Sequence, residues 1–165
     1  MNTRSRIMLL LTFCFFGTQG LLLSQSIQSE LKSLTDGADV ILTGKVINQT
    51  SSWNADRSRI YTEVTLRADE YLKGDYSENT LSVKTLGGEV GDVGELYSHM
   101  PKFTNDEEVL LFVKKDNKDL SYRVLNGEEG KLTLYEDKAT GEKVTSFNKK
   151  ISTLKKEIKS YVELR

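Results

Sequence analysis

The feature that most limits the possible folds is a two-residue alternation of apolar side chains that recurs along the chain. A β-strand sends successive side chains to opposite faces, so this period places one face in a core and the other in water. The pattern runs longest over residues 60–72, where the inward set is Ile60, Thr62, Val64, Leu66, Ala68 and Leu72. Since ordinary strands have about five or six residues, this length indicates a bent strand and suits a small barrel.

Shorter runs of the same kind predict further strands. They lie at residues 40–46, 81–85, 120–124 and 132–134. Residues 109–113 read Val-Leu-Leu-Phe-Val, which is apolar on both faces and predicts a central strand covered on both sides. The sequence therefore predicts a mainly β chain, folded as a small OB-like barrel of five or six strands.

Two helices are expected beside the barrel. Ile27, Leu31 and Leu34 follow helical spacing and precede Gly37, which predicts a short N-terminal helix. A second apolar stripe predicts a C-terminal amphipathic helix over residues 148–164; its members are Ile151, Leu154, Ile158, Tyr161 and Val162. Such a helix either packs its stripe on a sheet or lies on an anionic membrane. The stripe contains no Trp or Phe, which favours packing on the sheet.

The first 26 residues have the three parts of a secretory signal peptide. Residues 1–6 are short and basic, residues 7–16 are apolar, and small residues follow at 17–20 and 24–26. The apolar run is about half of the roughly 20 residues that span a bilayer. We expect cleavage after Gly20 or Ser26, with Ser26 preferred. The prediction is a periplasmic or extracellular protein, with residues 27–165 as one domain and no integral membrane segment after cleavage.

Cysteine content and charge narrow the possible functions. Cys14 is the only cysteine and lies in the leader, after Phe13, whereas lipid attachment requires a small residue before the cysteine. The exported chain would therefore hold no disulfide and depend on packing. The whole chain has 23 basic and 24 acidic residues, and the leader removes Arg4 and Arg6, leaving a net charge of −3. This acidic balance argues against nucleic acid as a partner.

The expected working surface is the long segment at residues 87–107, which lies between two predicted strands and shows no periodicity. Irregular loops of this length inside a small domain are usually functional or partly disordered. We therefore predict a binding surface formed by this segment and the nearby tryptophan. Its candidate residues are Trp53, Gly87, Gly88, Glu89, Gly91, Asp92, Glu95, His99 and Phe103.

The same segment lacks the pattern of known cofactor and metal sites. Its glycine-rich start has no Lys-Ser/Thr for phosphate, and its carboxylates would repel one. The carboxylate spacing also fails the calcium loop of an EF-hand. His99 is the single histidine, too few for a zinc site. The expectation is a chain without cofactor, metal or catalytic residues.

A set of residues in order resembles a known family. The set is Ala38-Asp39, Gly44, Val46, Trp53, Ile60-Tyr61-Thr62, Leu72-Lys73-Gly74, Gly87-Gly88, Gly91, Pro101, Phe103, Glu108, Leu110-Leu111-Phe112, Tyr122 and Gly130-Lys131. It resembles a bacterial exported domain of uncharacterised function, similar in layout to the OB-fold barrel of netrin-like modules and tissue inhibitors of metalloproteinases. The resemblance implies the barrel. Those inhibitors chelate the target zinc through a disulfide-locked N-terminal cysteine, which this chain lacks.

Three functions remain open at this point. The first is an exported, non-catalytic module that binds a protein, such as an exported protease, in the manner of an inhibitor. The second is a hydrolase that uses two carboxylates, with candidates Glu89, Asp92, Glu95, Glu107 and Glu108. The third is oligosaccharide binding, which is frequent on OB barrels. The oligomeric state is not determined by the sequence.

Overall fold

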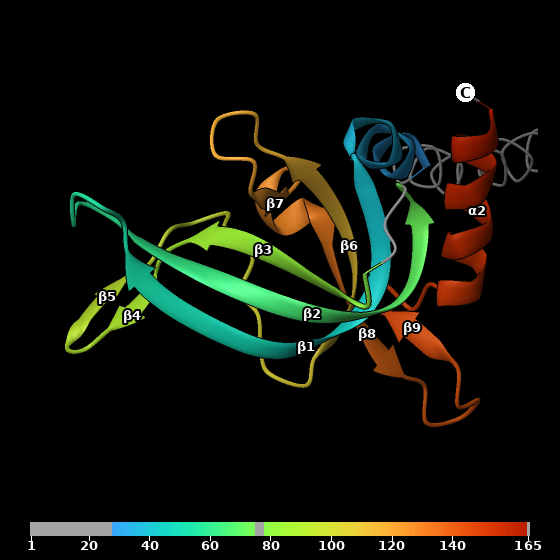
Figure 1. The fold of residues 1–165 in the computed structure, drawn as a ribbon. Coiled ribbons are helices and arrows are strands. Elements are labelled where there is room, and N and C mark those ends of the chain that lie inside the picture. Colours follow the sequence, from blue (N-terminus) through green and yellow to red (C-terminus); the bar gives the residue numbers. More distant parts are fainter. Residues whose placement is uncertain (1–27, 75–77, 165) are drawn as a thin grey trace, which may run out of the picture. The chain divides into compact units, whose positions relative to one another are not determined.

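The computed structural model describes residues 28–74 and 78–164. The described chain is mainly β and contains a closed barrel of five strands, with a short helix near its start and another at its end (Figure 1). This confirms the predicted fold class. The predicted signal peptide at 1–26, with Cys14 and both candidate cleavage sites, lies outside the described residues.

The barrel closes because its first strand pairs with neighbours on both edges. Its strands are β1 (Val40–Trp53), β2 (Ile60–Lys73), β3 (Thr80–Leu86), β6 (Glu108–Lys115) and β7 (Tyr122–Val124). They are ordered β1-β2-β3-β7-β6, and β6 returns to pair with β1. Every neighbouring pair is antiparallel except β3 and β7, which run parallel.

The strand β6 is central, as its doubly apolar sequence predicts. It pairs with β1, β7 and β8 (Lys131–Glu136), and residues 109–113 are completely buried. Val109, Leu111 and Val113 belong to the core inside the barrel. The intervening Leu110 and Phe112 point to the opposite face and are equally buried. Both apolar faces of β6 are therefore buried, one inside the barrel and the other outside it.

The remaining strands lie outside the closed barrel. A short 3-10 helix η1 (Gly127–Gly130) precedes β8, and β9 (Lys143–Thr145) pairs with β8. The segment 87–107, predicted to be irregular, contains a hairpin of β4 (Gly88–Val90) and β5 (Val93–Glu95). Each of these strands has three residues, which is too short for a two-residue period to be recognised in the sequence.

Backbone irregularities correct two details of the predicted alternation. The β1 and β2 register shifts next to Thr43 and again next to Ile41, so one extra β2 residue is inserted at each place. The period on β2 is broken there, and Tyr71, which is not in the inward set predicted for residues 60–72, packs against the barrel core. Leu120, predicted within a strand, has a φ of 58° in the turn before β7 and is exposed.

Helix α1 is described over residues 28–37 and confirms the predicted N-terminal helix, although Ile27 lies outside the described part. Helix α2 spans Ile151–Glu163, three residues later than the predicted start at 148. The delay has a backbone cause, because Asn148 has a φ of 56° and Lys150 is extended. Leu154 and Ile158 are the buried residues of α2, as expected for a helix that packs its apolar stripe.

Candidate functional site

The candidate site lies where β1, β2 and β3 extend beyond the part of the sheet that β6 closes. β1 pairs with β6 only from Val40 to Lys45, whereas its pairing with β2 continues to Trp53. The result is a ribbon in which β2 lies between β1 and β3 and the outer edge of β1 is unpaired, with the β4–β5 hairpin beside its far end (Figure 1).

Two glycines allow the hairpin to approach this ribbon. Gly87 and Gly88 have φ values of 95° and 134°, a region that strongly favours glycine. A Cβ atom on Gly88 would lie 2.3 Å from Thr62 Oγ1 and 2.4 Å from Ser51 Oγ. Thr62 Oγ1 donates a hydrogen bond of 2.7 Å to the Gly87 carbonyl. The glycine pair thus serves close packing of the hairpin on β1 and β2.

Glu95 fastens the end of the hairpin to the ribbon. Its Oε2 accepts hydrogen bonds from the Ile60 backbone N–H (3.0 Å) and from the Tyr97 hydroxyl (2.9 Å). Arg59 donates to the same hydroxyl at 2.7 Å, and this bond is the main cause that raises the pKa of Arg59. Glu95, predicted to contact a ligand, is therefore used to position the hairpin.

The hairpin, the ribbon and the following segment enclose an open groove, here called the mouth groove, with a volume of about 710 Å³. Residues on three barrel strands form one part of it: Gln49, Ser51, Thr62, Thr85 and Leu86. The segment after β3 supplies the rest: Gly87, Gly88, Glu89, Gly94, Glu95, Leu96, Tyr97, Met100, Pro101, Lys102 and Phe103. A mouth of a β-barrel is a common place for ligand sites.

Two side chains of the mouth groove are unusual. Thr85 Oγ1 is buried and has no hydrogen-bond partner among the described residues, although buried hydroxyls are normally paired. Leu96 is 78% exposed, although it is a large apolar side chain. A ligand that covers Leu96 would remove this side chain from water, whereas Thr85 Oγ1 is covered by the protein itself.

The structure brings together five of the nine predicted site residues. Gly87, Gly88, Glu89, Glu95 and Phe103 line the mouth groove. The other four do not line it. Trp53 ends β1, Gly91 and Asp92 form the exposed turn of the hairpin, and His99 is an exposed residue whose carbonyl accepts a hydrogen bond from Glu128 N–H.

A mostly buried ion pair holds the far side of the groove. Lys131 Nζ lies 2.6 Å from Glu107 Oε1, and their side chains are only 11% and 13% exposed. The same ammonium lies 4.9 Å from the Phe103 ring centroid and donates to the Lys102 carbonyl. Thr133 Oγ1 also donates to Glu107. The groove wall at Lys102 and Phe103 is therefore fixed by β8 and the start of β6.

Two of the carboxylates considered for hydrolysis are held in ion pairs outside the mouth groove. Glu107 pairs with Lys131, and Glu108 pairs with Lys143 of β9. Within residues 28–74 and 78–164, no cluster of three or more His, Cys, Asp or Glu residues is arranged to hold a metal ion. Of the five candidates, Glu89 and Glu95 line the mouth groove.

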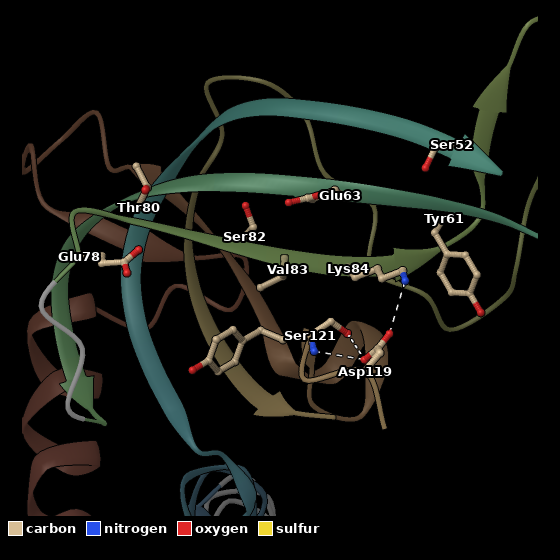
Figure 2. Close-up of a pocket in the computed structure, with 11 residues that line it drawn as sticks. Ser52, Tyr61, Glu63, Glu78, Thr80, Ser82, Val83, Lys84, Asp119 and Ser121 are labelled. Carbon is tan, nitrogen blue, oxygen red and sulfur yellow. Dashed lines mark hydrogen bonds and ion pairs between the residues drawn. The ribbon is translucent and has the colours of Figure 1, made fainter. Parts of the chain in front are cut away.

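A second groove, here called the side groove, lies on the outer face of β2 and β3 beside the loop that joins β6 to β7 (Figure 2). Its volume is about 530 Å³. Its lining is mostly polar and includes two tyrosines: Ser52, Tyr61, Glu63, Glu78, Thr80, Ser82, Val83, Lys84, Asp119, Ser121 and Tyr122. None of these residues is among the nine predicted site residues, because the β2–β3 register and the position of the loop are tertiary properties.

Charges in the side groove are ordered by hydrogen bonds. Asp119 accepts from the Ser121 hydroxyl (2.6 Å) and backbone N–H (3.1 Å), which lowers the pKa of this carboxyl. Lys84 Nζ lies 3.4 Å from Asp119 and 4.6 Å from the Tyr61 ring centroid. Lys84 thereby links the β3 face to the loop, with one aromatic ring held beside it.

Comparison with known proteins returned no assignment: no family model matches the chain, and no curated protein matches it. In the part of the chain that the structure describes, no helix is both long and apolar enough to cross a bilayer. The function is therefore inferred from the two grooves.

Proposed function

We propose that the chain is an exported, non-catalytic binding module that holds a protein partner in the mouth groove. The observation that carries the proposal is the large apolar side chain of Leu96, which is 78% exposed in the mouth groove. Covering an exposed apolar side chain stabilises a complex by about 25 cal/mol for each Å² removed from water.

The composition of the groove fits a protein surface. Aromatic residues and Met are enriched at the centres of protein interfaces, and the groove presents Tyr97, Met100 and Phe103 beside Leu96. Tyr97 is fixed by Arg59 and Glu95. A wall whose side chains are already ordered loses little entropy when a partner binds.

An exported protease is the partner class suggested by the resemblance to netrin-like modules. Their inhibitory mechanism uses a terminal cysteine, whereas the only cysteine here is Cys14 in the predicted leader. The proposed contact is therefore the mouth groove. We place the protein in the periplasm or outside the cell, in keeping with the signal-like first 26 residues.

The test replaces one exposed apolar residue in the groove and one elsewhere. Leu96→Ser removes the apolar contact, and Phe147→Ser is the matched control because both side chains are 78% exposed. Immobilised wild-type protein is used to capture partners from the exported fraction of the host. A captured protein is then titrated against both variants.

The proposal predicts that Leu96→Ser weakens the affinity at least tenfold, while Phe147→Ser changes it less than twofold. Equal binding by wild type and Leu96→Ser contradicts the mouth groove as the site. Intact-mass measurement of the exported protein checks the leader separately, with a start at Ile27 expected and a start at Met1 contradicting export by cleavage.

The side groove supports a second candidate function, the binding of an oligosaccharide. Ligands of OB barrels commonly contact the face of the second and third strands, and here Tyr61 and Ser82 lie on that face. Titration with chitotetraose and cellotetraose tests it. Binding that is lost in Tyr61→Ala and kept in Tyr135→Ala, an exposed tyrosine elsewhere, supports it; no binding of either sugar counts against it.

A further inference from the structure

We propose that the bound part of the protein partner is an extended peptide, which pairs as an added strand with the free edge of β1 at residues 49–53. This inference rests on the proposed function of the mouth groove and names how the partner binds there. It is argued from the β1 register, from the place where β6 leaves the sheet, and from the residues that line the groove.

The register shows which backbone groups of β1 are free. Asn54 N–H donates to the Arg59 carbonyl, and β1 pairs with β2 without a shift from Asn48 onward. Hydrogen-bonded pairs alternate along an antiparallel ladder, so Thr50 and Ser52 bond to β2. The N–H and C=O groups of Gln49, Ser51 and Trp53 therefore point to the opposite edge, where no described residue bonds to them.

The edge is open because β6 does not accompany β1 over its whole length. Val46 still exchanges backbone hydrogen bonds with Glu107 and Asp106, at 2.9 Å each. Asp106 then has a φ of 68°, and the chain before it no longer pairs with β1. The position beside residues 49–53 is the continuation of the β6 line, so a strand placed there would extend the existing sheet.

The edge also lacks the usual protection against pairing. Natural edge strands are commonly blocked by charged residues or Pro, but residues 48–53 read Asn-Gln-Thr-Ser-Ser-Trp. A hydrogen bond of 3.2 Å from Gln49 Nε2 to Asn105 Oδ1 joins only side chains. It leaves the backbone groups of the edge available.

The groove beside the edge defines the chemistry of the peptide. Gln49 and Ser51 line the mouth groove and carry two of the free backbone positions. Alternate side chains of an added strand would point toward this groove, since side chains alternate between faces. There they would meet Leu96, Met100 and Phe103. The expected ligand is an uncharged, extended segment with apolar side chains at alternate positions, a mode known as β-augmentation.

The experiment uses the exported protein and a displayed library of random octapeptides as the probe. A selected peptide is synthesised twice, each time with N-methyl groups on one of the two alternating sets of residues. N-methylation removes a backbone donor and leaves the side chain. We expect one set to weaken binding at least tenfold, measured by fluorescence anisotropy, and the other to change it less than threefold. Failure to select a peptide, or equal effects of both sets, overturns the proposal.

A substitution in the protein tests the same edge of β1 without changing the peptide. Ser51→Pro removes the N–H that points outward and leaves the Thr50 and Ser52 bonds to β2, and Pro is tolerated on edge strands. Ser51→Ala is the control, because it loses the same hydroxyl and keeps the N–H. We expect at least a tenfold loss for Ser51→Pro relative to Ser51→Ala, with the far-ultraviolet circular dichroism unchanged. Equal affinity of the two variants overturns the proposal. The N-methylated peptides are measured on the wild-type protein, so that test does not depend on the stability of Ser51→Pro.

Two outcomes separate this proposal from the proposed function. If binding depends on Leu96 and does not change with N-methylation, the mouth groove is supported as the site and the added strand is contradicted. A concentration-dependent dimer that Ser51→Pro abolishes, together with no peptide binding, assigns the edge to a second copy of the chain and overturns the peptide as occupant.

Discussion

The two halves of β1 belong to one continuous strand and have opposite environments. From Val40 to Val46 nearly every residue is buried, and the strand is flanked by β2 and β6. From Ile47 to Trp53 only β2 remains as a partner, and exposed residues alternate with half-buried ones. The first half contributes to stability through packing, whereas the second half provides an edge and a groove wall.

This contrast separates the half of β1 that stabilises the barrel from the half that we propose binds a partner. Apolar burial in the first half stabilises the fold by about 25 cal/mol for each Å² removed from water. The second half adds little to this core, so its surface is available for a partner. Changes in the two halves should therefore have different consequences, and four predictions test this in order of decreasing effect.

The largest loss of stability is expected in the first half of β1. Leu42 is completely buried in the barrel core, and truncation of such a side chain costs about 2 to 5 kcal/mol. Leu42→Ala should lower the free energy of unfolding by this amount in urea denaturation. Thr50→Ala, in the exposed second half, should change it by less than about 1 kcal/mol. Similar losses for both variants would contradict the division of β1.

The second effect concerns the boundary between the halves, where Glu107 bonds to Val46 through its backbone. Glu107→Gln leaves Lys131 mostly buried without its counterion, and breaking a buried pair costs about 3 to 5 kcal/mol, less at partial exposure. We expect a loss of about 2 to 3 kcal/mol. Stability should return in part when Lys131→Met is added. No recovery in the double variant would show that the pair is not the cause.

The third effect should fall on the second half alone. Gly88→Ala places a Cβ in close contact with Ser51 and Thr62 at a φ of 134°, a strain of about 1 to 3 kcal/mol. We expect the hairpin to shift and partner binding to weaken. Gly94→Ala is the control, since its Cβ would meet only ordinary contacts. Hydrogen exchange should show faster exchange in β4 and β5 for Gly88→Ala only; faster exchange in β6 as well would contradict a local effect.

The smallest effect is the pH dependence of the ion pairs between α2 and β2. Glu70 contacts Lys155 (2.8 Å) and Lys159 (2.7 Å), and hydrogen bonds from both lower the pKa of Glu70 below its ordinary value of 4.5. A lowered pKa contributes stability that is present above pH 4.5 and is lost as the pH falls through the folded-state pKa.

Glu70→Gln should therefore cost about 0.5 kcal/mol at pH 7, because solvent screens this half-exposed group. The difference between wild type and variant should vanish in acid, measured by urea denaturation at several pH values. Salt at 1 M should also reduce it. A difference that grows as the pH falls would contradict the assignment.

Much of the fold could be predicted because residues on a buried face are apolar and recur at a regular spacing in the sequence. The runs of Val64 and Leu66 on β2 and of Val109 to Val113 on β6 mark their buried faces directly. Tyr71 packs on the core although the predicted inward set omits it, because β-bulges insert single residues into β2 without a sequence signal. The start of α2 was missed for a similar reason, since Asn148 takes a left-handed conformation.

The candidate site was predictable only in part. The length and glycine content of residues 87–107 indicated that this segment lines a working surface, and Phe103 and Gly88 do line the mouth groove. Thr85 and Gln49 could not be included, because they reach the groove through strand pairing. The side groove was missed almost entirely, since it depends on the loop of Asp119 lying beside β3.

The sequence by itself determined the class of the fold, the central place of β6 and the two helices, because hydrophobic periodicity is a local consequence of which side chains leave water. It also determined that β1 carries no charge or Pro between Asn48 and Trp53. Only the tertiary structure decided that this stretch is an open edge. The reason is that β6 leaves the sheet at Asp106, and the pairing of two segments more than fifty residues apart is not encoded in the period of either one.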